Sequence, residues 1–187
     1  MNIIAALGNP GRKYEHTKHN FGFWVANRLA EQNRLSFRAG KGPYVFAQVS
    51  GKFVLLKPTT YMNDSGLAIQ GASRYFDINS ENILIVHDDI DLPLGTIRFR
   101  SGGGTGGHKG VESAIYHMRS ETMPRLRLGI STDSPMRPAE KYVLQPFDAS
   151  AKPVVQDVIE QACCGIDYFL LNGIMEAMNQ YNRKGTV

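Results

Sequence analysis

Apolar residues fall into two kinds of pattern along the chain. Short apolar runs bounded by turn residues predict strands over residues 2–7, 44–49, 52–57, 82–87, 96–100 and 125–130. Longer segments, with apolar residues three and four positions apart, predict helices over residues 21–32, 65–76, 111–118, 152–171 and 174–181. Because strands alternate with helices, we expect an α/β fold: a single domain with a mixed twisted β-sheet flanked by α-helices on both faces.

Local signals refine three of these boundaries. Ser50-Gly51 separates two strand-like runs and predicts a two-residue hairpin turn. Asn20 stands directly before an amphipathic segment and is a candidate helix N-cap. Asn172-Gly173 interrupts the longest helical pattern, so we expect one helix to end there and a second to begin.

The length and composition fit one soluble globular domain over residues 1–187. Hydrophobic residues make up 42% and charged residues 20% of the 187, which argues against a disordered chain. No apolar run reaches the roughly 20 residues that a membrane-spanning helix needs. The first residues lack the basic segment of a signal peptide and resemble a buried strand. We therefore expect a cytoplasmic protein with no membrane association.

The cysteines support the same compartment. The chain has two, Cys163 and Cys164, which are adjacent within a predicted helix. Neighbouring helical residues point in different directions, so a disulfide between them would be strained. We expect both to be reduced residues that pack in a cytosolic protein.

The positive charge is small in total but clustered. Lysine and arginine number 21 against 17 acidic residues, which gives a net charge of +4. Residues two apart on a strand share a face, so pairs of arginines on two predicted strands would form basic faces. A glycine-rich loop over residues 101–110 lies between these strands and would suit a nucleic-acid backbone beside them. The basic residues of the two strands and of a following loop are Arg98, Arg100, Arg125, Arg127, Arg137 and Lys141.

Candidate acid–base chemistry centres on His19, which stands before a predicted helix. A neutral imidazole takes up a proton near pH 7, which suits a general base. Such a histidine needs an acceptor for its other N–H group, and Asp88, directly after a predicted buried strand, can supply it. The amides of Asn9 and Asn63 can hold a water or polarise a carbonyl. Taken singly, each of these residues also fits an ordinary role in a helix cap or turn.

A metal-dependent reading of the same region stays open. Asp88, Asp89 and Asp91 follow a buried strand, and such carboxylates can bind Mg²⁺ for phosphoryl transfer. Their spacing does not match a calcium-binding loop. The glycine loop leads into a helix and so can bind an anion, although it lacks the phosphate-loop and dinucleotide-binding motifs.

Five ordered motifs of this chain resemble those of the bacterial-type peptidyl-tRNA hydrolases, and the resemblance covers nearly the whole length. The motifs are Gly8-Asn9-Pro10-Gly11 with Tyr14 and Thr17-Lys18-His19-Asn20-Phe21-Gly22; residues 57–66, KPTTYMNDSG; residues 87–93, HDDIDLP; residues 103–108, GGTGGH; and residues 125–130, RLRLGI.

The resemblance implies an enzyme that cleaves the ester bond between a peptide and its tRNA, which returns the tRNA to translation. It implies no metal or organic cofactor. By resemblance, His19 activates water, Asp88 supports that role and Asn9 distinguishes peptidyl-tRNA from aminoacyl-tRNA. The implied substrate-binding residues are Asn63 near the ester, Tyr14 and Tyr61 at the tRNA end, Met62 and Lys109 beside them, and Arg100 and Arg127 near tRNA phosphate. The implied partner is the acceptor stem and 3′ end of peptidyl-tRNA, bound by a monomer with no obligate protein partner.

One residue departs from the family pattern. Lys109 follows the Gly-Gly-His motif, where the family usually has an asparagine that helps to bind the tRNA end. Lysine donates hydrogen bonds but accepts none, and it adds a charge. Two other functions remain as alternatives: a non-catalytic RNA-binding protein on the same scaffold, and a metal-dependent phosphotransferase.

Overall fold

The computed structural model describes residues 1–133, 136 and 138–182, so Arg137 lies outside the described residues. Its strands are β1 (Asn2–Ala6), β2 (Arg38–Ala39), β3 (Tyr44–Val49), β4 (Phe53–Pro58), β5 (Ile83–Pro93), β6 (Ile97–Arg100) and β7 (Arg125–Ser131). Its α-helices are α1 (Phe21–Gln32), α2 (Ser65–Phe76), α3 (Lys109–Met118), α4 (Ala139–Val143) and α5 (Lys152–Tyr181). Short 3-10 turns η1 (Arg12–Tyr14), η2 (Lys18–Asn20) and η3 (Met62–Asp64) precede the cleft-forming segments.

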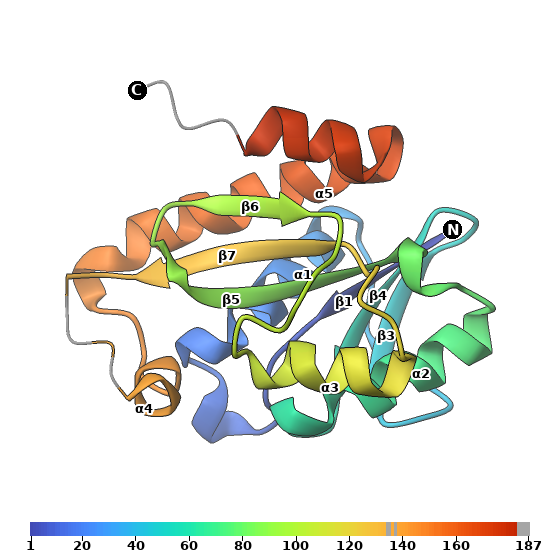
Figure 1. Ribbon diagram of the computed structural model, residues 1–187, viewed down its shortest axis with the longest axis horizontal. Helices are drawn as coiled ribbons and strands as arrows, with labels where there is room; N and C mark the ends of the chain where they lie inside the picture. Colours follow the sequence, from blue (N-terminus) through green and yellow to red (C-terminus); the bar gives the residue numbers. More distant parts are fainter. Residues whose placement is uncertain (134–135, 137, 183–187) are drawn as a thin grey trace.

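The strands form one mixed sheet in the order β2-β3-β4-β1-β5-β7-β6 (Figure 1). The four central strands β4, β1, β5 and β7 run parallel to one another. β3 and β2 add antiparallel strands at one edge, and β6 adds an antiparallel strand at the other. The carboxyl ends of the parallel strands therefore meet along one edge of the sheet, where α/β proteins place their sites.

Helices cover both faces of this sheet, which confirms the fold predicted from the sequence. Along β1, Ile4 packs on one face among residues of α1 and α5, whereas Ile3 and Ala5 pack on the other among residues of α2 and α3. This alternation follows from the period of two in a strand, and its all-apolar pattern is that of a strand buried on both sides. Within the described residues, no helix is both long enough and apolar enough to span a membrane.

The strand after residue 82 is longer than its apolar run predicts. β5 continues through the polar cluster to Pro93, and Asp88 and Asp89 pair with Leu128 and Gly129 of β7 before the register shifts. Asp88 thus lies within a strand, not just after one. α4 also differs from the expectation, because it places Lys141 in a short helix instead of a loop.

The prediction that the Asn20 side chain caps a helix is wrong. Asn20 does stand at the N-cap position of α1, but its side chain makes no capping hydrogen bond. The amide instead bonds to the backbone of Asn9. Both thiols are free, as expected, but only Cys163 is buried; Cys164 is exposed, so the prediction that it packs is wrong.

The expected break near residue 173 is confirmed. Gly173 has φ 81°, a left-handed conformation that glycine adopts without the steric cost of a side chain, and it divides α5 into two helical segments. The second segment lies against β6 (Figure 1). Just beyond it, Asn182 accepts a hydrogen bond from the backbone N–H of Phe99 and donates one to the carbonyl oxygen of the same residue, each at 2.8 Å.

Candidate active site

A cleft of about 350 Å³ opens at the carboxyl edge of the parallel strands, between α3, η3 and α4. Eight of the ten site residues expected from the sequence line it: Asn9, Tyr14, His19, Tyr61, Met62, Asn63, Asp88 and Lys109. The other two, Arg100 and Arg127, are not among its lining residues but lie on the adjoining strands β6 and β7.

His19 and Asp88 form the polar centre of the cleft. Nδ1 of His19 lies 2.9 Å and 3.0 Å from the two carboxylate oxygens of Asp88, and both residues are buried. Burial by itself raises the pKa of the Asp88 carboxyl group, but the charges and hydrogen bonds of His19 and His108 outweigh it and hold that pKa below its ordinary value. Asp88 is therefore ionised, and Nδ1 of His19 donates to it.

His108 is a second histidine that bonds to the Asp88 carboxylate. The sequence patterns do not predict it as a site residue. Nε2 of His108 lies 3.0 Å from Asp88 Oδ1. Nδ1 of His108 accepts hydrogen bonds from the backbone N–H groups of Gly110 and Val111 and so caps α3. Because Nδ1 is an acceptor, Nε2 carries the proton and donates to Asp88. The only signal in the sequence was its place in the Gly-Gly-His motif.

These bonds fix the state of His19. With Nδ1–H donated to a carboxylate, the neutral imidazole carries its lone pair on Nε2. The carboxylate also stabilises the imidazolium that forms when Nε2 takes a proton. The His19–Asp88 pair has the arrangement of a general base with an orienting carboxylate.

His87 closes the inner end of this cluster. Burial is the largest cause that lowers the pKa of His87 to about 3, and the neighbouring His108 lowers it further. Its Nδ1 donates to the backbone oxygen of Asp88 at 2.7 Å, and among the described residues its Nε2 is buried without a partner. His87 is thus a neutral group that holds the backbone of Asp88.

Asn9 is held on three sides. The amide of Asn20 accepts from the backbone N–H of Asn9 at 2.8 Å and donates to its carbonyl oxygen at 3.0 Å. The backbone N–H of Met62 donates to Asn9 Oδ1 at 2.7 Å. Since Oδ1 is occupied, the Nδ2 group is the part of this side chain that remains as a donor for a ligand in the cleft. Met62 is itself buried and belongs to the core under α2 and α3.

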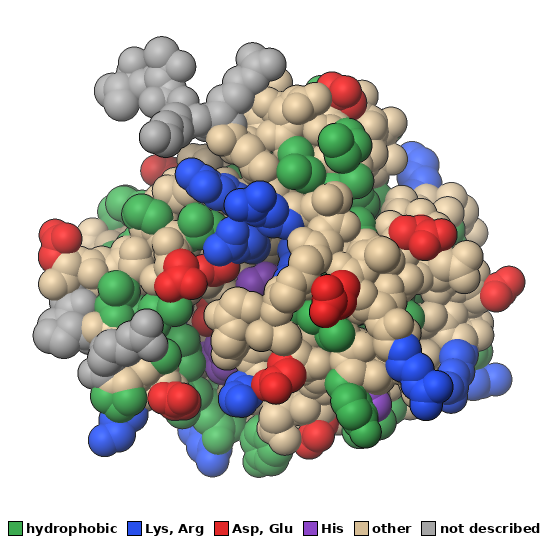
Figure 2. Space-filling model, viewed as in Figure 1, with side chains coloured by type: hydrophobic (Ala, Val, Ile, Leu, Met, Phe, Trp, Pro, Cys, Tyr) green, Lys and Arg blue, Asp and Glu red, His purple; other side chains and the backbone are tan. Residues whose placement is uncertain are grey.

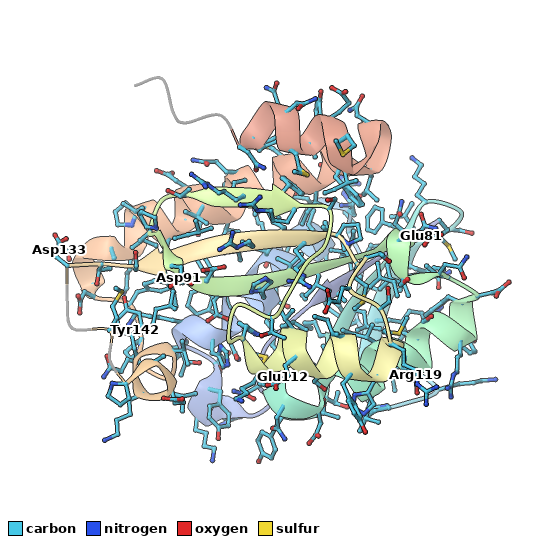
Figure 3. The ribbon with its side chains drawn as sticks, viewed as in Figure 1. Glu81, Asp91, Glu112, Arg119, Asp133 and Tyr142 are labelled. Atoms are coloured by element: carbon cyan, nitrogen blue, oxygen red, sulfur yellow. The ribbon has the colours of Figure 1, made fainter. Side chains whose placement is uncertain are left out.

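The outer wall of the cleft carries exposed polar and aromatic groups. Tyr14 and Tyr61 meet edge to face with ring centroids 6.1 Å apart. Asn63 is exposed, and its Nδ2 donates to Asp64 at 3.2 Å. Lys109 is the first residue of α3, and its ammonium group pairs with Glu112, labelled on α3 in Figure 3, at 3.1 Å.

The arginines expected to share strand faces do so. Arg98 lies opposite Arg127 and Arg100 opposite Arg125, so all four side chains leave the same face of β6 and β7. Figure 2 shows basic side chains gathered there beside the histidines of the cleft. Arg125 is buried and donates to the carbonyl oxygens of Gly103 and Gly104, which anchors the glycine loop. Burial lowers the pKa of Arg125.

The three aspartates considered as Mg²⁺ ligands are not assembled. Asp88 bonds to the two histidines, whereas Asp89 accepts from Arg127 Nε at 2.6 Å. Asp91 is exposed near the end of β5 (Figure 3). Among the described residues the one grouping with metal-ligand atoms close together is His19, Asp88 and His108, whose atoms lie within 4.8 Å of one another. Because Asp88 already bonds to both histidines, an ion there would have to replace those bonds.

Together, the mixed α/β sheet, the His19–Asp88 pair, the amide of Asn9 and the adjoining arginine face define a hydrolase suited to a polyanionic substrate. The family model of peptidyl-tRNA hydrolase matches residues 3–186. The chain belongs to this family, which confirms the resemblance read from its motifs.

Individual relatives agree along the whole length. A peptidyl-tRNA hydrolase of Syntrophomonas wolfei is 40% identical over 185 residues, which cover 97% of this chain and 100% of that protein. One of Chlorobaculum parvum is 40% identical over 187 residues, covering 98% of each. A crystal structure of peptidyl-tRNA hydrolase from Acinetobacter baumannii has a TM-score of 0.90 at 31% identity and covers 100% of this chain and 97% of that one.

Proposed function

We propose that the protein hydrolyses the ester bond between a peptide and the 3′ end of tRNA, with His19 as the general base. The observation that carries this is the double contact of His19 Nδ1 with the ionised Asp88, which leaves a basic Nε2 in a cleft lined by amides. A carboxylic ester needs a positioned water, a base and polarisation of its carbonyl, all of which side chains can supply.

His19, one water molecule and the ester account for every bond and proton in the reaction. His19 Nε2 takes a proton from water, and the oxygen of that water bonds to the ester carbonyl carbon. The bond from this carbon to the ribose oxygen then breaks, and the ribose oxygen takes the proton back from His19. The products are a peptide carboxylic acid, which ionises at neutral pH, and tRNA with a free 3′-terminal hydroxyl.

Amides complete the proposed chemistry. The Nδ2 group of Asn9 donates to a carbonyl of the peptide, which a free aminoacyl group lacks beyond its own ester. Asn63, exposed at the mouth, binds the substrate near the ester. The Asn9 donor is already oriented before the substrate arrives, because Asn20 and Met62 hold this residue.

The proposed tRNA-binding surfaces are the outer wall of the cleft and the arginine face of β6 and β7. Tyr14 and Tyr61 offer rings at the entrance for the terminal bases, and Lys109 offers a charge. The proposed partners of the acceptor-stem phosphates are Arg100 and Arg127, which leave the same face of β6 and β7. We further propose that the protein acts as a monomer in the cytoplasm.

The test is release of the blocked amino acid from N-acetyl-aminoacyl-tRNA, measured beside unblocked aminoacyl-tRNA and with and without EDTA. We expect cleavage of N-acetyl-aminoacyl-tRNA but not of unblocked aminoacyl-tRNA, at a rate that EDTA does not change. His19→Ala should lower kcat by about 10²-fold or more, the usual worth of a general base, while tRNA binding persists. His117→Asn is the matched control, because His117 lies on α3 outside the cleft lining and asparagine keeps a donor toward Ser113.

Three results would count against the proposal. A wild-type protein that binds tRNA without cleaving the ester would favour the non-catalytic RNA-binding alternative. Loss of activity in EDTA would favour a metal-dependent reaction. Wild-type turnover in His19→Ala, with a normal melting temperature, would show that another group activates the water.

A further inference from the structure

A second hollow of about 500 Å³ lies on the other side of Asn9 from the catalytic cleft, and the proposed chemistry does not use it. We name it the Lys57 groove. Its walls come from the segment before α1, the first turns of α1 and the end of β4, and its defining residues are Asn9, Arg12, Phe23, Trp24, Asn27 and Lys57. Asn9 is the residue that both hollows share.

The strand order fixes where this groove stands relative to the other parts of the site. Across the order β4-β1-β5-β7-β6, Lys57 lies on β4, Asn9 in the loop after β1, Asp88 on β5 and the arginine face on β7 and β6. Neighbouring strands lie about 4.8 Å apart, so β4 and β6 each lie roughly 10 Å from β5, which carries Asp88, on opposite sides of it. A substrate with its scissile bond at His19 therefore has one arm toward the arginines and the other toward Lys57.

The groove is suited to a peptide of varied sequence. Lys57 Nζ donates to Asn27 Oδ1 at 2.7 Å, and an ammonium group has two further protons to donate. The amide of Asn27 is exposed and offers both a donor and an acceptor. Phe23 and Trp24 supply apolar surface, and Trp24 is fixed by donating its Nε1–H to the backbone oxygen of Glu15 at 2.9 Å. Carbonyl groups and mixed side chains of a peptide match this combination.

We propose that the Lys57 groove binds the peptide arm of the substrate, starting about three residues from the ester. This inference rests on the proposed function. An extended chain advances about 3.3–3.6 Å per residue, so roughly three residues cover the distance from the catalytic pair to β4. A single blocked amino acid is too short to reach the groove, whereas a longer peptide enters it after passing Asn9.

The experiment compares two substrates on the same tRNA: one carries an N-acetylated single residue and the other an N-acetylated pentapeptide with the same C-terminal residue. Lys57→Met keeps the aliphatic stem over Phe37, which the ammonium group approaches to 4.0 Å, and removes only the charge and donors. Asn27→Ala removes an exposed amide from α1 at no cost in helix propensity. Each should raise KM for the pentapeptide substrate by about fivefold, the worth of one net hydrogen bond, and leave KM for the short substrate unchanged.

Two further variants make the comparison specific. Lys52→Met removes an exposed lysine that directly precedes β4, at the end of the strand away from Lys57, and should change neither KM. Leu144→Ser changes the α4 wall of the catalytic cleft, the other route that a peptide could take. If Leu144→Ser alone produced the length-dependent effect, the peptide would run over α4 and the groove assignment would be wrong.

Other results would also overturn the proposal. Equal increases in KM for both substrates in Lys57→Met would assign the groove to the RNA. No change in either substrate, in the combined Lys57→Met and Asn27→Ala variant with an unaltered melting temperature, would leave the groove without a role in binding. Failure of the proposed function looks different, since the wild-type protein would then cleave neither substrate.

Discussion

The side-chain amide of Asn20 is paired with the backbone of Asn9, eleven residues earlier in the chain. Asn20 Oδ1 accepts from Asn9 N at 2.8 Å, and Asn20 Nδ2 donates to Asn9 O at 3.0 Å. Both residues are buried. The pair ties the start of α1, directly after His19, to the loop after β1. The two hydrogen bonds of Asn20 therefore fix the proposed base, His19, relative to the proposed carbonyl donor, Asn9.

Asn20→Ala should therefore impair both folding stability and catalysis. Loss of a buried amide that makes two hydrogen bonds costs about 1–3 kcal/mol of unfolding free energy. Displacement of Asn9 by about 1 Å should lower kcat/KM by up to 10²-fold. Urea denaturation and single-turnover hydrolysis measure the two effects. Asn33→Ala, which removes an amide bonded to Leu29 at the other end of α1, is expected to lower stability only; the prediction fails if Asn20→Ala does no more than this control.

His87 should make the protein less stable as the pH falls. Its pKa is about 3 in the folded protein, mainly because of burial, against an ordinary value of 6.5. Between these values the unfolded chain binds the proton and the folded protein does not, so the free energy of unfolding decreases as pH drops through this range. The slope of one such group is at most about 1.4 kcal/mol per pH unit.

The matched variant is His87→Asn, because an asparagine amide can still donate to the backbone oxygen of Asp88 but does not titrate. Its unfolding free energy should fall less between pH 7 and pH 4 than that of the wild type, as urea titrations at several pH values would show. Asp88, whose pKa is lowered, adds a loss in the same direction below its ordinary pKa in both proteins. Parallel curves for the two proteins would contradict the neutral, buried state of His87.

The arginine face should give tRNA binding a steep salt dependence. Arg100 is exposed on β6, and removal of one phosphate contact lowers the slope of log K against log salt by about 1. We expect this for Arg100→Gln in binding measurements from 50 to 200 mM salt. Arg38→Gln removes an exposed arginine from β2 at the opposite edge of the sheet and should leave the slope unchanged. Equal slopes in Arg100→Gln and wild type would remove Arg100 from the tRNA interface.

Lys109→Asn should change KM for peptidyl-tRNA more than kcat. Lys109 lines the cleft and its ammonium group pairs with Glu112, whereas His19 is held by Asp88, so substitution of Lys109 alters binding of the tRNA end and leaves the base in place. Steady-state kinetics separate the two constants. Glu112→Gln keeps Lys109 but frees its charge, and it should lower KM at low salt. A large change in kcat at constant KM would place Lys109 in the chemical step.

The sequence predicts elements well where local pattern and tertiary structure agree. The apolar run before His87 and the break at Gly173 are such cases, since burial and backbone geometry act within a few residues. The end of β5 is not, because Asp88 and Asp89 stay in the strand through pairing with β7, which is distant in sequence. Asn20 has the local chemistry of a helix cap, but its amide is used by Asn9.

The site shows the same division. The sequence predicts His19, Asp88 and Asn9 as site residues because their motifs resemble those of one family. The fold brings all three to one cleft. His108 gave no pattern of its own, since a lone histidine in a glycine loop becomes informative only when its ring reaches Asp88. The Lys57 groove likewise depends on β4 and the start of α1 lying together, which no local spacing encodes.

The contact between Asn182 and Phe99 has a consequence for how the molecule behaves at high concentration. β6 is an edge strand, and free N–H and carbonyl groups on such a strand can pair with a strand of another molecule. The amide of Asn182 occupies both groups of Phe99, as the backbone of an adjacent strand would. Asn182, at the end of the helical segment after Gly173, thus blocks edge-to-edge strand pairing, and so aggregation, at the strand that carries Arg98 and Arg100.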